Sequence, residues 1–176
     1  MIVSVRLLAL LTILLAPACA AEAPKILSRD HYVEVRSTVP AIAGQTVKLY
    51  LRERVSAAMP DRITGDKVVL FVHGAGTPGS VAFDVPYQDY SWMAFLAAAG
   101  YDAFAVDLTG YGRSTRPEAM NDPANLSAEQ RHALGVPEVK ERTYSGGMPT
   151  IASDWDDISA VVAYIRKLRG GARRVD

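Results

Sequence analysis

Residues 67–79 read Lys-Val-Val-Leu-Phe-Val-His-Gly-Ala-Gly-Thr-Pro-Gly, and this stretch decides the fold of the 176-residue chain. Its apolar run at 68–72 is unbroken, which is typical of a strand buried on both faces of a parallel sheet. The loop that follows holds the small residues Gly74, Ala75, Gly76 and Gly79. Because these residues carry little side-chain bulk, backbone N–H groups can point at a ligand oxygen without obstruction. The stretch predicts a buried strand that leads into a ligand-binding loop.

The glycine loop permits two interpretations. Its three glycines spell the dinucleotide-binding pattern G-x-G-x-x-G after a strand, and the acidic residue Asp107 ends the next expected strand. That mode of binding requires a helix that begins directly at the glycines. Pro78 and Pro86 interrupt the following segment, and the nearest good helix is expected near Ser91. The alternative is an oxyanion hole, which needs no adjacent helix because one or two amides stabilise the oxygen that becomes negative in acyl transfer.

A second motif decides between these interpretations. Residues 107–114 read Asp-Leu-Thr-Gly-Tyr-Gly-Arg-Ser and follow another apolar stretch, 101–108, that is expected to be a strand. The two motifs, in this order and separated by a helix-sized segment, resemble those of the α/β-hydrolase superfamily over roughly residues 30–176. There, an H-G-x loop follows the third strand and a D-x-x-G-x-G-x-S turn follows the fourth. The resemblance favours the oxyanion hole.

The resemblance implies an α/β fold, a three-layer α/β/α sandwich with a mostly parallel sheet of the α/β-hydrolase type. The fold would be incomplete, with about four strands plus the start of a fifth. Residues 32–36 and 46–54 would form its antiparallel opening hairpin, joined by a turn at Ala43-Gly44. Alternating apolar and polar residues in the second of these segments favour a strand with one wet face.

The segment between the two motifs should contain one helix. Residues 92–99 carry apolar side chains on nearly every side, so this helix is expected to pack tightly on the sheet, with Ser91 as its cap and Gly100 after its end. Residues 80–90 show neither a helical nor a strand period. They are interpreted as a wall of the active-site mouth, with ordinary loop packing as the alternative.

The carboxyl-terminal part should contain two more helices. Residues 115–150 are an excursion rich in proline, with one short helix at 126–134 capped by Ser127, and such loops shape substrate pockets in the superfamily. Residues 153–169 are the clearest helix because apolar side chains recur at three and four residues. Its expected N-cap is Ser153. The acidic residues suited to the positive end of its dipole, or less plausibly to a metal, are Asp154, Asp156 and Asp157.

The resemblance also implies which residues form the site. The backbone N–H of Ala75 would bind the oxyanion, supported by His73, Gly74 and Gly76. In the superfamily, the residue at the position of Asp107 usually braces the turn and the loop that carries the H-G motif. The residues expected to form this structural turn at the edge of the site are Asp107, Gly110, Gly112, Arg113 and Ser114.

The chain is not expected to contain a catalytic nucleophile, acid or base. Residues 173–176 look like the start of the strand that leads, in the superfamily, into the nucleophile elbow G-x-S-x-G. Ser145 is rejected as the nucleophile because Thr143 stands where that elbow needs glycine. His31 and His132 precede the point where the superfamily's base appears. The chain is interpreted as the amino-terminal half of an esterase-like or lipase-like serine hydrolase that is inactive by itself; an aspartate nucleophile would indicate a dehalogenase or epoxide-hydrolase relative.

Composition restricts the partners. Lysine and arginine together number 19, as do aspartate and glutamate, so no net positive field attracts nucleic acid. The single cysteine, Cys19, excludes an internal disulfide framework and a thiolate metal cluster. The histidines at 31, 73 and 132 have no metal-site spacing. The expected ligand is a small-molecule ester or related acyl compound, without a cofactor, a metal or nucleic acid.

Residues 1–20 are interpreted as a bacterial-type export signal. Arg6 gives a positive start, 7–15 form an apolar core, and Ala18-Cys19-Ala20 is a small-residue cleavage pattern. The apolar run is too short for a stable membrane span, although a retained membrane helix is an alternative. Cys19 could also carry a lipid anchor. Residues 21–176 would then be the amino-terminal part of a hydrolase domain in a periplasmic or secreted protein.

Two other functions remain open from the sequence. One is a secreted, non-catalytic module that binds a partner through an exposed sheet edge. The other is a dinucleotide-binding enzyme, which the export signal disfavours.

Overall fold

The computed structural model describes residues 23–59, 66–139, 141 and 147–170. The expected export signal with Cys19, the rejected nucleophile Ser145 and the expected strand start at 173–176 lie outside the described residues. No helix of the described part is both long enough and apolar enough to cross a membrane.

The described strands form one sheet of four, in the order β1-β2-β4-β3. Their bounds are β1 Ile26–Arg36, β2 Thr46–Ser56, β3 Val68–Val72 and β4 Asp102–Asp107. The opening hairpin is confirmed, with longer strands than expected, because β1 pairs antiparallel with β2 over its whole length. The turn at Ala43-Gly44 is also confirmed, since Gly44 has a φ of +78°.

The expectation of a mostly parallel sheet is matched only in part by the described strands. Of their pairings, β3 with β4 is parallel, whereas β1 with β2 and β2 with β4 are antiparallel. The hairpin contributes two long strands, and its second strand lies beside β4, so antiparallel contacts dominate. The parallel pair is nonetheless the pair that carries both glycine motifs.

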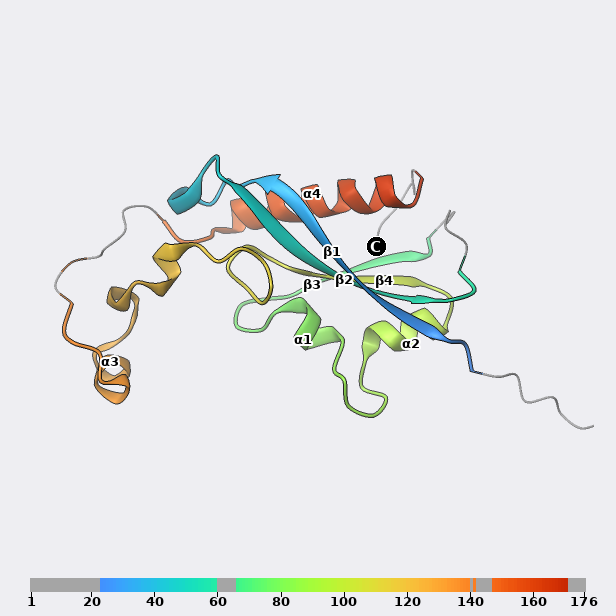
Figure 1. Cartoon of the computed structure of the whole chain (residues 1–176), viewed down its shortest axis with the longest axis horizontal. Coiled ribbons are helices and arrows are strands. Elements are labelled where there is room, and N and C mark those ends of the chain that lie inside the picture. Colours follow the sequence, from blue (N-terminus) through green and yellow to red (C-terminus); the bar gives the residue numbers. More distant parts are fainter. Residues whose placement is uncertain (1–22, 60–65, 140, 142–146, 171–176) are drawn as a thin grey trace, which may run out of the picture.

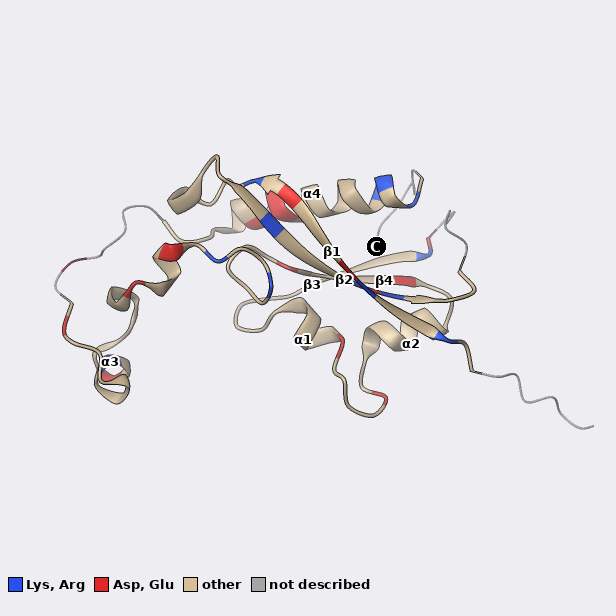
Figure 2. Ribbon diagram, viewed as in Figure 1, with Lys and Arg blue, Asp and Glu red and all other residues tan. Residues whose placement is uncertain are grey.

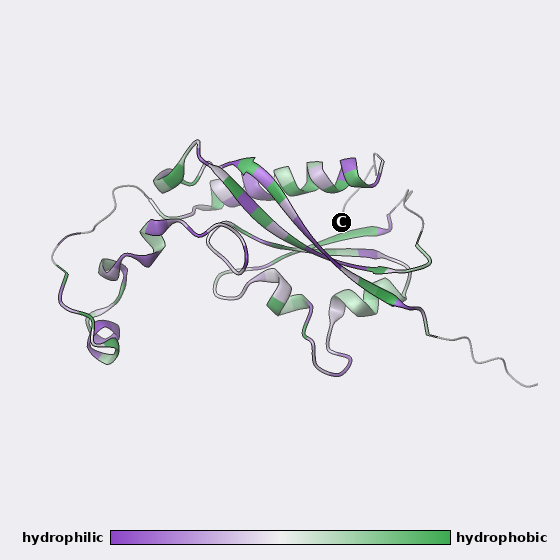
Figure 3. Cartoon of the chain, viewed as in Figure 1, coloured by the Kyte–Doolittle hydropathy of each residue, from purple (hydrophilic) through white to green (hydrophobic). Residues whose placement is uncertain are grey.

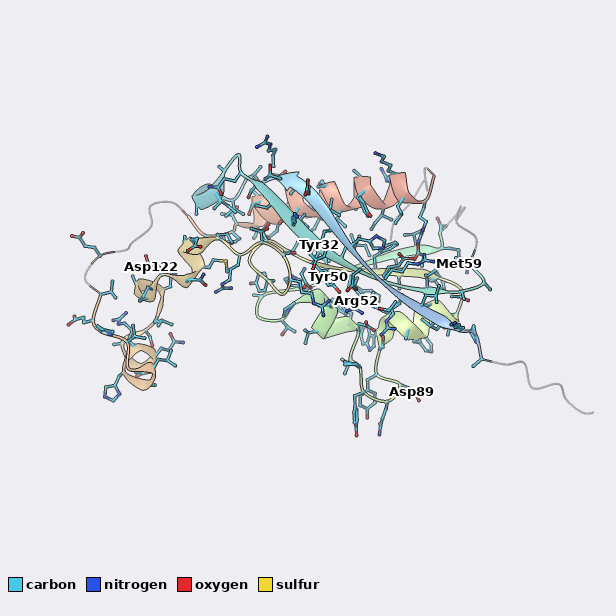
Figure 4. The ribbon with its side chains drawn as sticks, viewed as in Figure 1. Tyr32, Tyr50, Arg52, Met59, Asp89 and Asp122 are labelled. Carbon is cyan, nitrogen blue, oxygen red and sulfur yellow. The ribbon has the colours of Figure 1, made fainter. Side chains whose placement is uncertain are left out.

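Helices cover the sheet on two faces, which confirms the three-layer arrangement (Figure 1). The short helices α1 (Gly79–Phe83) and α2 (Trp92–Ala98) lie on one face, and the long helix α4 (Ile151–Leu168) lies on the other. The excursion extends away from the sheet and carries Asp122 on its outer part (Figures 1 and 4). Its elements are the 3-10 turns η2 (Glu118–Asn121) and η3 (Pro123–Asn125) and the helix α3 (Ala128–Leu134); a further 3-10 turn, η1 (Pro40–Ile42), joins β1 to β2.

Strand β4 divides the core into two clusters. Because successive side chains of a strand point to opposite faces, Phe104 and Val106 pack with Val161 and Ile165 under α4. Ala103 and Ala105 face the other way and pack with Met93 of α2. All six residues of β4 are buried. The alanines leave room for α2 to lie close to the sheet.

Strand β3 is the edge of the described sheet, although it is strongly apolar (Figure 3). Its last residue, Val72, is 36% exposed. Helix α2 was expected to pack tightly on the sheet, and it buries Met93 and Ala97. Its apolar side chains on the other side remain outside the core, because Trp92 and Phe95 are 66% and 72% exposed.

Both helices predicted for the carboxyl-terminal part of the chain are confirmed, but the N-cap of the second is a different residue from the one expected. Helix α3 begins after Ser127 and has a capping box with Gln130. Helix α4 begins two residues earlier than expected, and its N-cap is Thr150 rather than Ser153. Ser153 is the third helical residue, and its hydroxyl completes the capping box by accepting the N–H of Thr150 at 2.9 Å. Acidic residues begin this helix and basic residues end it (Figure 2).

Candidate active site

The two glycine motifs follow the carboxyl ends of β3 and β4 and therefore lie at the same end of the sheet. Strands β3 and β4 are parallel and end at Val72 and Asp107, so the loops that leave them begin side by side. The carboxyl ends of parallel strands are where ligands bind in open α/β sheets. The residues after each strand therefore define the candidate site.

His73 joins these two loops through both of its ring nitrogens. Its Nε2 accepts the backbone N–H of Leu108 at 3.1 Å, and its Nδ1 lies 2.7 Å from the carbonyl oxygen of Gly74. Since Nε2 acts as an acceptor, the ring proton belongs on Nδ1, which donates it to Gly74. The ring is also buried and stacks edge-on against Tyr111. Both ring nitrogens of His73 thus make structural hydrogen bonds, and neither is left for a catalytic base.

This hydrogen bond also determines the direction of the next amide. The carbonyl of Gly74 and the N–H of Ala75 belong to one trans peptide unit, in which the two groups point in opposite directions. Because His73 holds the carbonyl, the N–H of Ala75 points away from the imidazole ring. Within the described residues, the amides of Gly74, Ala75 and Gly76 make no hydrogen bond. They are available to an oxygen of a ligand.

The beginning of α1 corrects the expectation for residues 80–90. A helix does begin at Gly79, immediately after the glycine loop, with Pro78 as its N-cap residue. The five-residue length of α1 gave no detectable period, and proline is well tolerated at the start of a helix. A helix N-terminus at this place is the feature that dinucleotide binding requires. Pro78 and Pro86 by themselves therefore do not exclude that function.

Asp107 provides a different argument against dinucleotide binding. Its Oδ1 accepts the N–H of Ser80 at 3.1 Å, and its Oδ2 accepts the N–H of Arg113 at 3.0 Å. A protein carboxylate therefore already occupies the N-terminus of α1. A pyrophosphate would have to displace this negative charge from a fully buried position.

Glycines are required where the turn after β4 surrounds this carboxylate. A Cβ at Gly112 would lie 2.0 Å from Asp107 Oδ2, and one at Gly79 would lie 2.3 Å from the carbonyl oxygen of Val106. Gly110 has a φ of +95° and faces the side chain of Met120. By contrast, a Cβ at Gly74 would touch nothing within 4 Å. The crowded positions are therefore in the turn after β4 and at the first residue of α1, whereas Gly74 in the candidate oxyanion loop has open space beside it.

Ser114 and Arg113 attach the same turn to the opening hairpin. The hydroxyl of Ser114 donates to the carbonyl oxygen of Asp107 and accepts the N–H of Tyr50 at 2.8 Å. Arg113 donates to the Tyr50 hydroxyl at 3.0 Å, and Arg52 donates to it at 2.8 Å. Tyr50 and Arg52 lie close together on β2 (Figure 4). Burial raises the pKa of Tyr50, so the hydroxyl stays protonated and donates to Asp30 at 2.9 Å.

Asp157 is a site-edge residue that sequence reasoning assigned to another role. It was expected to interact with the helix dipole, but it is buried, and its Oδ2 accepts the N–H of Thr109 at 3.0 Å. Burial raises the pKa of Asp157. A first-turn aspartate and a buried tertiary acceptor have the same local sequence signature. Only the position of α4 against β4 distinguishes them.

A cavity of about 160 Å³ lies between the ends of β3 and β4 and the beginning of α4. Its lining includes His73, Leu108 and Asp154 together with the apolar residues Val72, Ile151, Trp155 and Ile158. Burial also raises the pKa of Asp154. A larger cavity of about 490 Å³ lies beside α2 and is lined mainly by Phe71, Trp92 and Phe95. The smaller cavity belongs to the candidate site because His73 lines it.

A cluster of buried charged residues lies at the amino end of β4, opposite the candidate site. Fully buried Glu53 accepts hydrogen bonds from Arg29 at 2.9 Å, His31 at 2.6 Å and Arg169 at 2.5 Å. Arg169 also donates to Asp102 at 2.6 Å. Asp102 is the first residue of β4, whereas the candidate site lies beyond its last. The cluster therefore ties α4 to the amino end of the sheet and keeps His31 away from the site.

Comparison with known proteins assigns the family. A family model described as the alpha/beta hydrolase family matches residues 69–176, more than half of the chain. The chain belongs to this family. A solved structure titled "The Atomic Resolution Structure of a Novel Bacterial Esterase" is similar at 20% identity, with 69% of this chain covered and a TM-score of 0.32. The hydrolase-family chain spans 36% of the length of that esterase. No curated protein matches this chain.

In this member of the family, the described structure brings together the residues singled out around both motifs and separates them from the other histidines. His73, Asp107 and Ser114 meet at one sheet edge. His31 lies in the charged cluster, and His132 lies on α3 in the excursion. The described residues contain no group of three or more His, Cys, Asp or Glu side chains that could hold a metal ion.

Proposed function

We propose that the chain is part of an exported hydrolase that cleaves an ester or related acyl bond, with the backbone N–H of Ala75 as an oxyanion donor. The supporting observation is the fixed peptide unit after Gly74. Its carbonyl is held by His73 at 2.7 Å, while the N–H on its other side has no partner among the described residues. A pre-oriented, unpaired amide is the group that stabilises a developing oxyanion.

The charges near this amide favour a neutral substrate. The described residues that line the adjacent cavity include Asp154 but no lysine or arginine. A phosphate group would be repelled by an ionised Asp154, whereas a neutral ester would acquire its negative charge only during the reaction. The apolar lining by Trp155, Ile151 and Val72 suits an acyl or alkyl group.

The nucleophile belongs to residues outside the described part of the chain. Both nitrogens of His73 are used in structural hydrogen bonds, and no serine in the described residues stands between a buried strand and a helix in the elbow arrangement. We assign the role to a serine of the parent protein, with histidine as base and a carboxylate to orient it. An aspartate nucleophile is the alternative. Because the described residues contain neither an elbow nucleophile nor a histidine free to act as its base, we expect the 176-residue chain to be inactive by itself.

The proposed export rests on residues 1–20, and Cys19 is the proposed site of any lipid anchor. Mass spectrometry of the mature protein tests both. Cleavage after Ala20 supports a free exported protein, and an acylated amino-terminal Cys19 supports a lipoprotein. An intact Met1 with its apolar run would contradict export by a cleaved signal.

Hydrolysis of short-chain p-nitrophenyl esters by the parent protein tests the assignment of Ala75. Ala75→Pro removes the N–H, whereas Ala75→Gly and Ala75→Ser retain it. We expect a loss of about 10²–10³ in kcat for the proline variant, with little change for the two controls. Wild-type turnover that survives the proline substitution in a folded protein would exclude this amide as the donor.

A non-catalytic binding module is the second candidate, and one observation favours it. Strand β3 is the edge of the described sheet, and its apolar residues 70–72 are partly exposed. An unpaired strand edge can accept a strand from another chain. A parent protein that turns over no ester and binds a peptide along β3 would support this function instead.

A further inference from the structure

Two consecutive amides at the end of β4 are held by side chains from different layers of the fold. The N–H of Leu108 donates to Nε2 of His73 at 3.1 Å, and the N–H of Thr109 donates to Oδ2 of Asp157 at 3.0 Å. Both acceptor side chains are buried. The loop after β3 and the helix α4 therefore hold adjacent peptide units of the same segment.

The contact of His73 continues to the candidate oxyanion donor. Its Nδ1 donates to the carbonyl oxygen of Gly74 at 2.7 Å, and that carbonyl shares a peptide unit with the N–H of Ala75. A continuous path of hydrogen bonds and backbone thus runs from α4 to this amide. Its members, in order, are Asp157, Thr109, Leu108, His73, Gly74 and Ala75.

Asp157 is not a helix cap. Helix α4 begins at Ile151, so Asp157 is its seventh residue and lies beyond the first turn, where the unpaired helical amides are found. Thr150 already caps the helix. A buried carboxylate is costly unless it is hydrogen-bonded, and the partner that Asp157 has among the described residues is the Thr109 amide.

We infer that Asp157 is a positioning residue for the Ala75 amide, an inference that rests on the proposed role of that amide as an oxyanion donor. Asp157 fixes the peptide of Thr109, which places the Leu108 amide against His73. The orientation of His73 then determines the direction of the Gly74 carbonyl and of the N–H of Ala75. Helix α4 thereby controls a loop from which it is separated by a strand end.

Nuclear magnetic resonance of the parent protein tests this inference without any need for turnover. The ring nitrogens of His73 report its tautomer, and the amide resonances of Thr109 and Ala75 report the two ends of the path. Asp157→Ala removes the acceptor, and Asp157→Asn retains an acceptor oxygen without the charge. The matched control is Asp156→Ala, because the Asp156 carboxylate contacts the Thr38 hydroxyl at the surface, at 2.7 Å.

We expect Asp157→Ala to shift the Thr109 amide and to move the His73 ring nitrogens and the Ala75 amide as well. Asp157→Asn should produce smaller shifts of all three groups, and Asp156→Ala should leave them unchanged. The inference is overturned if a folded Asp157 variant shifts Thr109 alone. If the alanine variant does not fold, the asparagine variant decides by the same criterion. Failure of the proposed hydrolase function would show as absent ester turnover by the parent protein and would leave these resonances unaffected, so the two failures are distinguishable.

Discussion

The carboxylate of Asp107 accepts the backbone N–H of Ser80 at 3.1 Å, so the last residue of β4 occupies the N-terminus of α1. This relationship separates the two functions that a glycine loop after a strand can indicate. A helix N-terminus would be an anion-binding site if it were open. Here the protein's own carboxylate fills it, whereas the amides of Gly74, Ala75 and Gly76 in the preceding loop have no partner among the described residues.

Replacing Asp107 should destabilise the fold. Asp107→Ala would remove the buried acceptor of the Ser80 and Arg113 amides, and each lost hydrogen bond costs about 1–3 kcal/mol. We expect the free energy of unfolding in urea to fall by about 3 kcal/mol. Asp107→Asn should fall by less, because one side-chain oxygen remains. Equal stability of the alanine variant and the wild type would show that the turn does not depend on this carboxylate.

The glycines of the two motifs should respond differently to alanine. A Cβ at Gly112 would meet Asp107 Oδ2 at 2.0 Å with a φ of +49°, whereas a Cβ at Gly74 would meet nothing within 4 Å. We expect Gly112→Ala to destabilise by about 2 kcal/mol or more. Gly74→Ala should remain within about 0.5 kcal/mol of the wild type. Thermal or urea unfolding of the pair measures this contrast, which would disappear if the turn could relax around the added methyl group.

Removing the central cation of the buried cluster should be more costly than removing a surface one. Arg169→Met leaves Glu53 and Asp102 buried without the guanidinium that joins them. Breaking a buried ion pair in this way costs about 3–5 kcal/mol. The control is Lys167→Met in the last turn of the same helix, which is exposed and should change stability by about 0.5 kcal/mol or less. Similar unfolding curves for the two variants would contradict the assigned role of Arg169.

The pH dependence of stability should identify the protonation of Asp102. Burial raises the pKa of Asp102 from 3.8 to about 6, despite the neighbouring Arg169. The folded state then binds a proton more readily than the unfolded state, so this group adds stability as the pH falls from above 6 toward 4. Asp102→Asn lacks this contribution. The stability advantage of the wild type over Asp102→Asn should therefore grow by about 1.4 kcal/mol between pH 7.5 and 5, and by up to about 3 kcal/mol well below pH 3.8.

Glu53 changes the pH dependence of stability in the opposite direction to Asp102. The comparison with Asp102→Asn is therefore needed to separate the two effects. The hydrogen bond from His31 and the charge of Arg169 hold the pKa of Glu53 below its usual value, against the effect of burial. Its contribution is present above the usual pKa and is lost as the pH falls through the lowered value. Glu53 is present in both the wild type and Asp102→Asn. The difference between their free energies of unfolding in urea, measured at pH 7.5 and 5, therefore isolates the contribution of Asp102. An advantage of the wild type that shrinks on acidification would mean that the ion pair outweighs burial at Asp102.

Much of the fold could be predicted from local patterns. The unbroken apolar run of β3, the alternation in β2 and the three-and-four spacing in α4 each depend on neighbours within one element. Helix α1 could not be predicted, because five residues after a proline carry no period. Strand order also has no local signature, so the antiparallel contact of β2 with β4 was missed.

The residues of the candidate site likewise divide into those that a local sequence pattern predicts and those that it does not. His73, Asp107 and Gly112 were singled out because their motifs are contiguous in sequence. The roles of Asp157 and Ser153 were assigned incorrectly because a serine or an aspartate near a helix start fits several roles equally well. Which role each residue takes depends on where α4 lies against β4. That packing is a tertiary property.

The most direct test of the central claim is a structure of the parent protein after reaction with a phosphonate ester, whose charged oxygen imitates the oxyanion. We predict this oxygen at about 2.7–3.1 Å from the backbone nitrogen of Ala75, with His73 still bonded to Leu108 and Gly74. A phosphonyl oxygen bound elsewhere, with the Ala75 N–H directed at solvent, would contradict the assignment.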